Sequence, residues 1–112
     1  MITKPVILWI GASPQVVVPV SQYDTIWNFV FSVRYEDAEW TIPAGATAKL
    51  MGRTSASTTF EIDGTISDNK ITVTASTSVT GVAGNSVCEV RIIADGKQVS
   101  TANFILAVEK AP

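Results

Sequence analysis

The residues of this chain that are able to do chemistry are few and scattered. The densest acidic cluster is Glu36-Asp37-Ala38-Glu39, where paired carboxylates would suit glycoside hydrolysis or a loose calcium site. The cluster lies between an apolar segment and Trp40, and it lacks the alternate-oxygen spacing and central glycine of an EF-hand. We therefore interpret it as a solvated turn rather than a catalytic pair.

The sequence contains no histidine, which removes the commonest general base, the commonest metal ligand and the usual serine or cysteine triads. Its one cysteine, Cys88, lies at an apolar position of an alternating segment, so we expect a buried thiol that is no nucleophile. Gly81-Val82-Ala83-Gly84 has neither the ending nor the following helix of a phosphate loop. We predict no catalytic residue, no metal ligand and no cofactor, and therefore no enzyme.

Three tryptophans in a small domain could supply a platform for sugar rings, since aromatic faces stack on pyranose rings. Trp27 belongs to an alternating apolar series and is expected in the core. Trp9 and Trp40 lie outside that series, beside proline and glycine turns, and are candidate ligand-contact aromatics. The alternative, which we favour, is that they cover the ends of the fold.

Composition indicates one packed domain spanning residues 1–112. The chain is 46% hydrophobic and only 16% charged, which excludes a disordered segment. A net charge of −2 with scattered Lys and Arg offers no basic stripe, so nucleic acid is not an expected partner. The apolar run after Lys4 is broken by Gly11 and Pro14 well before signal-peptide or membrane-spanning length, so no export or membrane signal is predicted.

The elements that must position these residues are strands. Short segments rich in Val, Ile, Thr and aromatic residues are separated by turn residues about every ten positions, which predicts an all-β antiparallel sandwich or barrel. The predicted strands are Pro5 to Ile10, Gln15 to Val20, Thr25 to Tyr35, Ala46 to Arg53, Thr58 to Ile62, Thr65 to Ser67, Ile71 to Ser76, Ser86 to Ala94 and Gln98 to Val108.

Alternation along these segments also predicts which side chains form the core. Five residues of the third strand share one face, and three residues of neighbouring strands are expected to join them. These residues are Trp27, Phe29, Phe31, Val33 and Tyr35, together with Leu50, Ile71 and Val73.

Turn chemistry predicts the connections. Tight turns are expected at Asp63-Gly64, Asp68-Asn69 and Asp95-Gly96, a bend at Pro43-Ala44-Gly45, and a loop at Thr80 to Asn85. The small polar stretch Thr54 to Thr59 is either a flexible loop, which we favour, or a weak edge strand. A two-residue turn at Asp95-Gly96 would put polar Thr101 and Asn103 on the core face. We therefore predict a three-residue loop, Ala94-Asp95-Gly96, which aligns Cys88, Val90 and Ile92 with Ala102, Phe104, Leu106 and Val108.

The order of several segments resembles a known family. The relevant stretches are Ala46 to Leu50, Gly64 to Val73, Val82 to Asn85, Val87 to Val90 and, beyond Asp95-Gly96, Thr101 to Glu109. Together they resemble the N-terminal immunoglobulin-like domain of phage baseplate upper proteins and of related phage tail and head-fibre structural proteins. The resemblance covers nearly the whole chain and carries no catalytic signature.

The resemblance implies an immunoglobulin-like β-sandwich that serves as a virion structural module. Such a module docks on other virion proteins of the baseplate, tail or capsid, usually as a trimer, and holds a fibre or receptor-binding part at its C-terminal side. The implied location is the virion, after synthesis in the host bacterial cytoplasm. Family members continue beyond the sandwich, whereas this chain stops at Pro112, so it is either an excised domain or a short protein of its own.

Strand edges are the surfaces by which such a sandwich meets partners, because their backbone donors and acceptors are unpaired. The first strand is apolar on both of its faces, and we predict a partner interface there, formed by Val6, Ile7, Leu8, Trp9 and Ile10. An adhesive or carbohydrate-binding module that uses Trp9 or Trp40 is the alternative function. No small-molecule substrate is expected.

Overall fold

The computed structural model describes all 112 residues and confirms the all-β class. Its strands are β1 (Ile2–Ile10), β2 (Val17–Ser21), β3 (Trp27–Tyr35), β4 (Ala38–Glu39), β5 (Thr47–Arg53), β6 (Thr59–Ser67), β7 (Lys70–Thr74), β8 (Gly84–Ala94), β9 (Lys97–Ser100) and β10 (Phe104–Glu109). One short helix, α1 (Thr77–Thr80), was not predicted. A helix of one turn is too short to show a hydrophobic period, so the sequence pattern does not reveal it.

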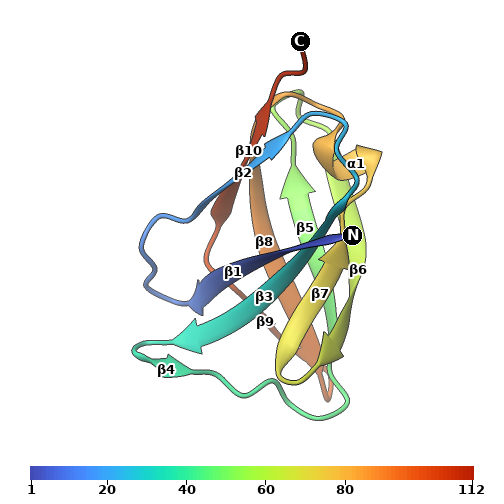
Figure 1. Cartoon of the computed structure of the whole chain (residues 1–112). Helices are drawn as coiled ribbons and strands as arrows, with labels where there is room; N and C mark the ends of the chain where they lie inside the picture. The colour runs from blue at the N-terminus through green and yellow to red at the C-terminus, as the bar shows by residue number, and fades with distance from the viewer.

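The strands form one sheet that folds over on itself into two facing layers (Figure 1). Their order is β1-β3-β7-β6-β5-β8-β10-β2, with β4 beside β3 and β9 beside β8. Layer A contains β1, β3, β7 and the end of β6, and layer B contains the start of β6 with β5, β8, β10 and β2. The predicted sandwich is confirmed, and its two outermost strands are β1 and β2.

Strand β6 makes the corner between the layers. Its residues 59–64 pair with β5, whereas residues 65–67 pair with β7. Gly64 stands at the change of partner, where a Cβ atom would lie 2.7 Å from Cγ2 of Ile71. The turn predicted at Asp63-Gly64 is therefore wrong: the glycine permits a close approach inside one continuous strand, and the two strands predicted on either side of it are a single element.

Both outermost strands pair in parallel, which differs from the antiparallel arrangement expected from the sequence. Strand β1 runs parallel to β3, with Ile2 beside Trp27, and β2 runs parallel to β10, with Val17 beside Ile105. The other pairings are antiparallel. Alternation of apolar and polar residues reports which face a side chain occupies and carries no information on strand direction.

The core lies between the layers and follows the predicted alternation. Phe29, Phe31 and Val33 are each 1% exposed, and the expected neighbours from β5 and β7 (Leu50, Ile71 and Val73) are also buried. The phenyl rings of Phe31 and Phe104 approach to 5.7 Å between centroids across the two layers. The two residues at the ends of β3 are less buried than predicted: Trp27 is half-buried and Tyr35 is 52% exposed.

The β8–β9 hairpin turns in two residues, so the predicted three-residue loop is wrong. Ala94 pairs with Lys97, and Asp95 and Gly96 have φ of 52° and 73°, the positive values of a type I′ turn. The register then shifts by one residue between β9 and β10, because Ile92 faces Val99 while Cys88 faces Phe104. The predicted pairing of Cys88 with the even-numbered series is thus correct for β10.

The shift is absorbed at Thr101, which is 4% exposed on the core side. Its N–H donates to the Val90 carbonyl at 3.0 Å, and its hydroxyl oxygen accepts from the Val90 N–H at 3.0 Å. The threonine side chain thereby replaces a backbone acceptor, which lets a polar residue occupy a core position without an unsatisfied group.

The turn at Asp68-Asn69, the bend at Pro43 to Gly45 and the loop after Thr54 agree with the structure. The loop predicted at Thr80 to Asn85 is shorter, because Thr80 ends α1 and β8 begins at Gly84. Asp68 and Asn69 have φ of 52° and 59° in a two-residue hairpin, and Ala46 N–H closes the bend by donating to the Pro43 carbonyl at 3.2 Å. The Thr54 to Thr59 stretch is a loop anchored by Thr54, which is 5% exposed and shares a 2.6 Å hydroxyl contact with Thr58.

Gly52 in β5 lies opposite Phe60 in β6, and a Cβ atom at position 52 would sit 2.2 Å from Cζ of the phenyl ring. The ring therefore packs directly over the glycine backbone. We predict that Gly52→Ala lowers the free energy of unfolding by about 1–3 kcal/mol through overpacking, measured by urea denaturation.

The companion variant Gly52→Ala with Phe60→Leu should recover part of that loss relative to the sum of the two single changes, because a smaller side chain makes room for the methyl group. Wild-type stability of Gly52→Ala, or strict additivity of the two changes, would contradict this packing.

Candidate functional site

The predicted interface strand β1 is the outermost strand of layer A, and its two faces differ. Val6 and Leu8 point inward and are 6% and 1% exposed, so they belong to the domain's own core. Ile7 points outward and is 49% exposed, while Trp9 and Ile10 are half-buried. What β1 offers to a partner is therefore its outward side chains together with its free backbone edge.

Hydrogen-bond parity identifies the backbone groups at that edge. Ile2 N–H donates to the Ile26 carbonyl at 2.8 Å, so the even-numbered residues of β1 face β3. The odd-numbered residues present their groups on the other side, which we call the open edge of β1. There Ala102 N–H donates to the Trp9 carbonyl at 2.7 Å, while the N–H groups of Ile7 and Trp9 have no partner in the chain.

A groove of about 570 Å³ runs beside this open edge, between β1 and β2. Its lining is mainly apolar and comprises Lys4, Pro5, Val6, Ile7 and Trp9 from β1 and Pro14, Gln15, Val16, Val17, Val18 and Pro19 from the second segment. The ammonium group of Lys4 lies 4.6 Å from the centroid of the Trp27 ring, in a cation–π contact. The charge of β1 is thus engaged with an aromatic ring of its own domain.

The second candidate aromatic, Trp40, lies in a groove of about 280 Å³ beside the β8–β9 turn. Asp95, Lys97 and Gln98 supply polar groups to that groove, and Trp40 itself is half-buried against the core. Its backbone is fixed, because its N–H donates to the Val33 carbonyl at 2.9 Å and its carbonyl accepts from Asn69 Nδ2 at 3.1 Å. The two tryptophans lie in separate grooves.

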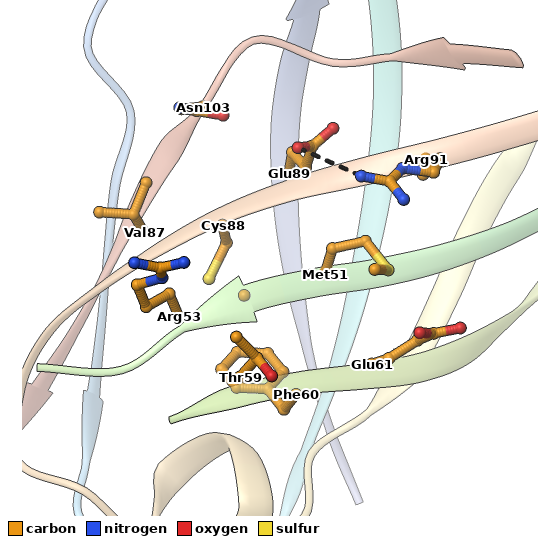
Figure 2. A pocket seen from close by; sticks show the side chains of 11 residues that line it. Met51, Arg53, Thr59, Phe60, Glu61, Val87, Cys88, Glu89, Arg91 and Asn103 are labelled. Carbon is orange, nitrogen blue, oxygen red and sulfur yellow. Dashed lines mark ion pairs between the residues drawn. The ribbon is translucent and has the colours of Figure 1, made fainter. Parts of the chain in front are cut away.

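The outer face of layer B carries a pocket of about 570 Å³ that sequence analysis missed (Figure 2). Its outward side chains include Met51 and Arg53 from β5 and Val87, Glu89 and Arg91 from β8. Glu89 pairs with Arg91 at 3.7 Å, and the neighbouring Glu61 of β6 pairs with Lys49 at 2.5 Å. The sequence does show polar residues at alternate positions of these strands. No sequence pattern, however, shows which strands lie side by side, so the pocket could not be predicted.

The Glu61 carboxylate on this face does not suit acid catalysis. The hydrogen bond from Lys49 and the positive charge of its ammonium group lower the pKa of Glu61. The same two interactions raise the pKa of Lys49. A general acid in glycoside hydrolysis needs the opposite shift.

The acidic cluster at Glu36 to Glu39 is exposed: Glu36 and Asp37 form the turn after β3, and Ala38 and Glu39 are the short strand β4. Glu36 has φ of 55°, and Arg34 donates from its guanidinium to the Asp37 carbonyl at 2.6 Å. Glu39 Oε1 accepts from Asn69 Nδ2 at 3.0 Å. No group of three or more His, Cys, Asp or Glu residues is arranged to hold a metal ion.

The glycine-containing loop before β8 is short. Gly81 to Ala83 connect α1 to β8, and Gly84 is the first residue of that strand. No helix of the structure has the length and apolar character needed to cross a membrane.

Comparison with known proteins shows the fold. No protein-family model matches the chain, and no curated protein sequence is similar to it. Among solved structures it is similar to the N-terminal domain of phage TP901-1 ORF48, with a TM-score of 0.78 and 16% sequence identity. The match covers 98% of this chain and 100% of that one, so the likeness extends to the whole domain.

Cys88 is buried as predicted, at 1% exposure, and burial raises the pKa of its thiol from 9.0 to about 12. We predict that thiol reagents near pH 8 modify the native protein about a thousandfold more slowly than the unfolded chain, because the reactive thiolate is suppressed. The measurement is the modification rate with and without denaturant.

The same shift gives a pH dependence. Below pH 9 the thiol is protonated in both states, whereas between pH 9 and about 12 only the unfolded state ionises, so stability falls as pH rises. Cys88→Ala is the control: it lacks this component, and its unfolding free energy should decline less steeply over that range. Equal alkaline slopes, or rapid modification of the native thiol, would contradict a buried protonated cysteine.

Proposed function

We propose that the chain is a structural module of a phage particle that acts by protein–protein docking and has no catalytic role. The observation that supports this most strongly is its similarity in fold to the N-terminal domain of phage TP901-1 ORF48 over 98% of the chain. The order of strands and turns that resembles phage baseplate upper proteins points to the same class. The lowered pKa of Glu61 and the burial of Cys88 fit a molecule with no general acid at Glu61 and no reactive thiol.

Docking takes place through β1 in this proposal. Ile7 and Trp9 are its outward apolar side chains, and Val6, Leu8 and Ile10 hold the strand on the core from behind. The open edge adds backbone donors and acceptors that a partner chain can pair. The partners are other virion proteins of the baseplate, tail or capsid, and the module is located in the virion after synthesis in the host cytoplasm.

A fibre or receptor-binding part would be held at the C-terminal side. The chain leaves the sandwich after β10, and Glu109 is exposed where the strand ends (Figure 1). This end of the molecule lies apart from the middle of β1, so both sites can be used at once. The resemblance that suggests this role also implies association of several copies, usually three.

The docking proposal predicts that Ile7→Asp lowers incorporation of the protein into phage particles by at least about tenfold, because a charge would be buried in the interface. The measurement is quantitative mass spectrometry of purified particles. Thr65→Asp is the matched control, since Thr65 is exposed on β6, at the far side of layer A, and should leave incorporation unchanged.

Both variants are first checked for native stability by thermal unfolding. Normal incorporation of folded Ile7→Asp would overturn the role of β1. Absence of the wild-type protein from particles would overturn the virion role itself.

A second candidate function is carbohydrate binding, favoured by one observation: Trp40 lies in a groove together with Asp95, Lys97 and Gln98. An aromatic face combined with carboxylate, amide and ammonium groups is the combination that sugar rings and their hydroxyls need. Trp9, in the other groove, is the lesser candidate because its surroundings there are mainly apolar.

For this second function we predict saturable binding on a glycan array that Trp40→Ala abolishes and Trp9→Ala preserves. Because Trp40 packs against the core, native folding of the variant is checked by circular dichroism. Gln98→Ala, a change outside the core, should weaken the same binding. An array on which the wild-type protein binds nothing would exclude this candidate.

A further inference from the structure

The hydrogen-bond ladder between β10 and β2 continues past the ends of both strands through a side chain. The two strands are parallel, with Glu109 beside Ser21, and Gln22 N–H donates to the Glu109 carbonyl at 2.8 Å. In a regular parallel ladder the Gln22 carbonyl would accept the next bond, from Ala111 N–H. That N–H instead donates to Oε1 of the Gln22 side chain at 3.2 Å. The side-chain amide thus takes the place of the backbone acceptor.

A turn after β2 explains why a side chain is needed there. Asp24 N–H donates to the Ser21 carbonyl at 3.2 Å, and Tyr23 has φ of 69°, in the left-handed region. Gln22 and Tyr23 are the central residues of this turn, so the backbone leaves the direction of β2 at Gln22. The side chain of Gln22 is long enough to reach the segment that follows β10.

The other end of the same amide is fixed as well. Gln22 Nε2 donates to the Gly81 carbonyl at 3.0 Å, directly after α1, and Tyr23 N–H donates to the Thr80 carbonyl at 3.0 Å. Thr80 is fully buried, and its hydroxyl donates to the Asp24 carbonyl at 3.0 Å. The turn that carries Gln22 is therefore attached to the core through α1, and the Gln22 amide is bonded on both sides.

The sequence adds an independent constraint on the segment that follows β10. Pro112 comes directly after Ala111, and a residue that precedes proline favours extended backbone. Ala111 is half-buried, whereas Lys110 and Pro112 are exposed. An extended conformation of Ala111 is thus favoured both by the following proline and by its hydrogen bond to Gln22.

We infer that Gln22 is a positioning residue that fixes the direction in which the chain leaves the sandwich. The inference rests on the proposed role of this end of the molecule, where a fibre or receptor-binding part would be held, and it makes the connection rigid. A part attached there keeps its orientation relative to the docked module, because bending the connection breaks the bond between Gln22 and Ala111.

The experiment compares the wild-type protein with Gln22→Met, which keeps a side chain of similar length and removes both polar groups of the amide. Gln15→Met is the matched control, because Gln15 is exposed and its side chain forms no hydrogen bond within the chain. Two quantities are measured by NMR: the amide exchange rate of Ala111 and the residual dipolar coupling of its N–H bond. The first reports the hydrogen bond, and the second reports the direction of the segment.

We expect the Ala111 amide to exchange at least about tenfold faster in Gln22→Met than in the wild type, because the amide loses its acceptor. Its dipolar coupling should fit the direction given by the structure in the wild type and fall towards zero in Gln22→Met, because the segment then samples many directions. Both quantities should be unchanged in Gln15→Met.

A wild-type Ala111 amide that exchanges as fast as an unstructured one, or whose coupling does not fit the structure, overturns the rigid connection without any substitution. Equal exchange and equal coupling in Gln22→Met overturn the role of Gln22, and thermal unfolding establishes that this variant is folded. Incorporation into particles is measured separately, so failure of this inference and failure of the virion role give different results.

Discussion

The structure depends on the pairing of backbone hydrogen-bonding groups along one folded sheet. Each strand between β1 and β2 has neighbours on both sides, and the side chains of both layers then meet in a shared core. Closing the sheet at β6 requires Gly64, because a Cβ atom there would meet Ile71. A sheet that folds in this way leaves the outer edges of β1 and β2 unpaired at its two ends, besides those of the short side strands β4 and β9.

Buried threonines provide hydrogen-bond partners for backbone groups in the irregular segments, where no neighbouring strand is in register to pair with them. Thr80 is fully buried, and its hydroxyl donates to the Asp24 carbonyl at 3.0 Å, which ties α1 to the segment before β3. Thr101 accepts from Val90 N–H where β9 gives way to β10, and Thr54 holds its own loop closed. Replacing backbone partners by hydroxyls allows bends at both ends of the sandwich without buried unsatisfied groups.

The use of threonine hydroxyls in place of backbone hydrogen-bond partners also explains which parts of the fold could be predicted. Alternation placed Phe29, Phe31 and Leu50 correctly, because a period of two directly reports burial. The same argument failed at Asp95-Gly96, where it assumed a constant register and that no polar residue would face the core. Thr101 breaks both assumptions through one hydroxyl. Strand direction and the corner at Gly64 depend on partners distant in sequence, which local patterns do not contain.

The interaction surfaces were predicted only in part for the same reason. The apolar character of Val6 to Ile10 identified β1 as unusual, but only the register with β3 separates core residues such as Leu8 from outward residues such as Ile7. The pocket on the outer face of layer B was not predicted, because Arg53 and Val87 become neighbours only through the pairing of β5 with β8. Each surface of a sandwich is formed by side chains from several neighbouring strands, so its residues can be identified only once the strand order is known.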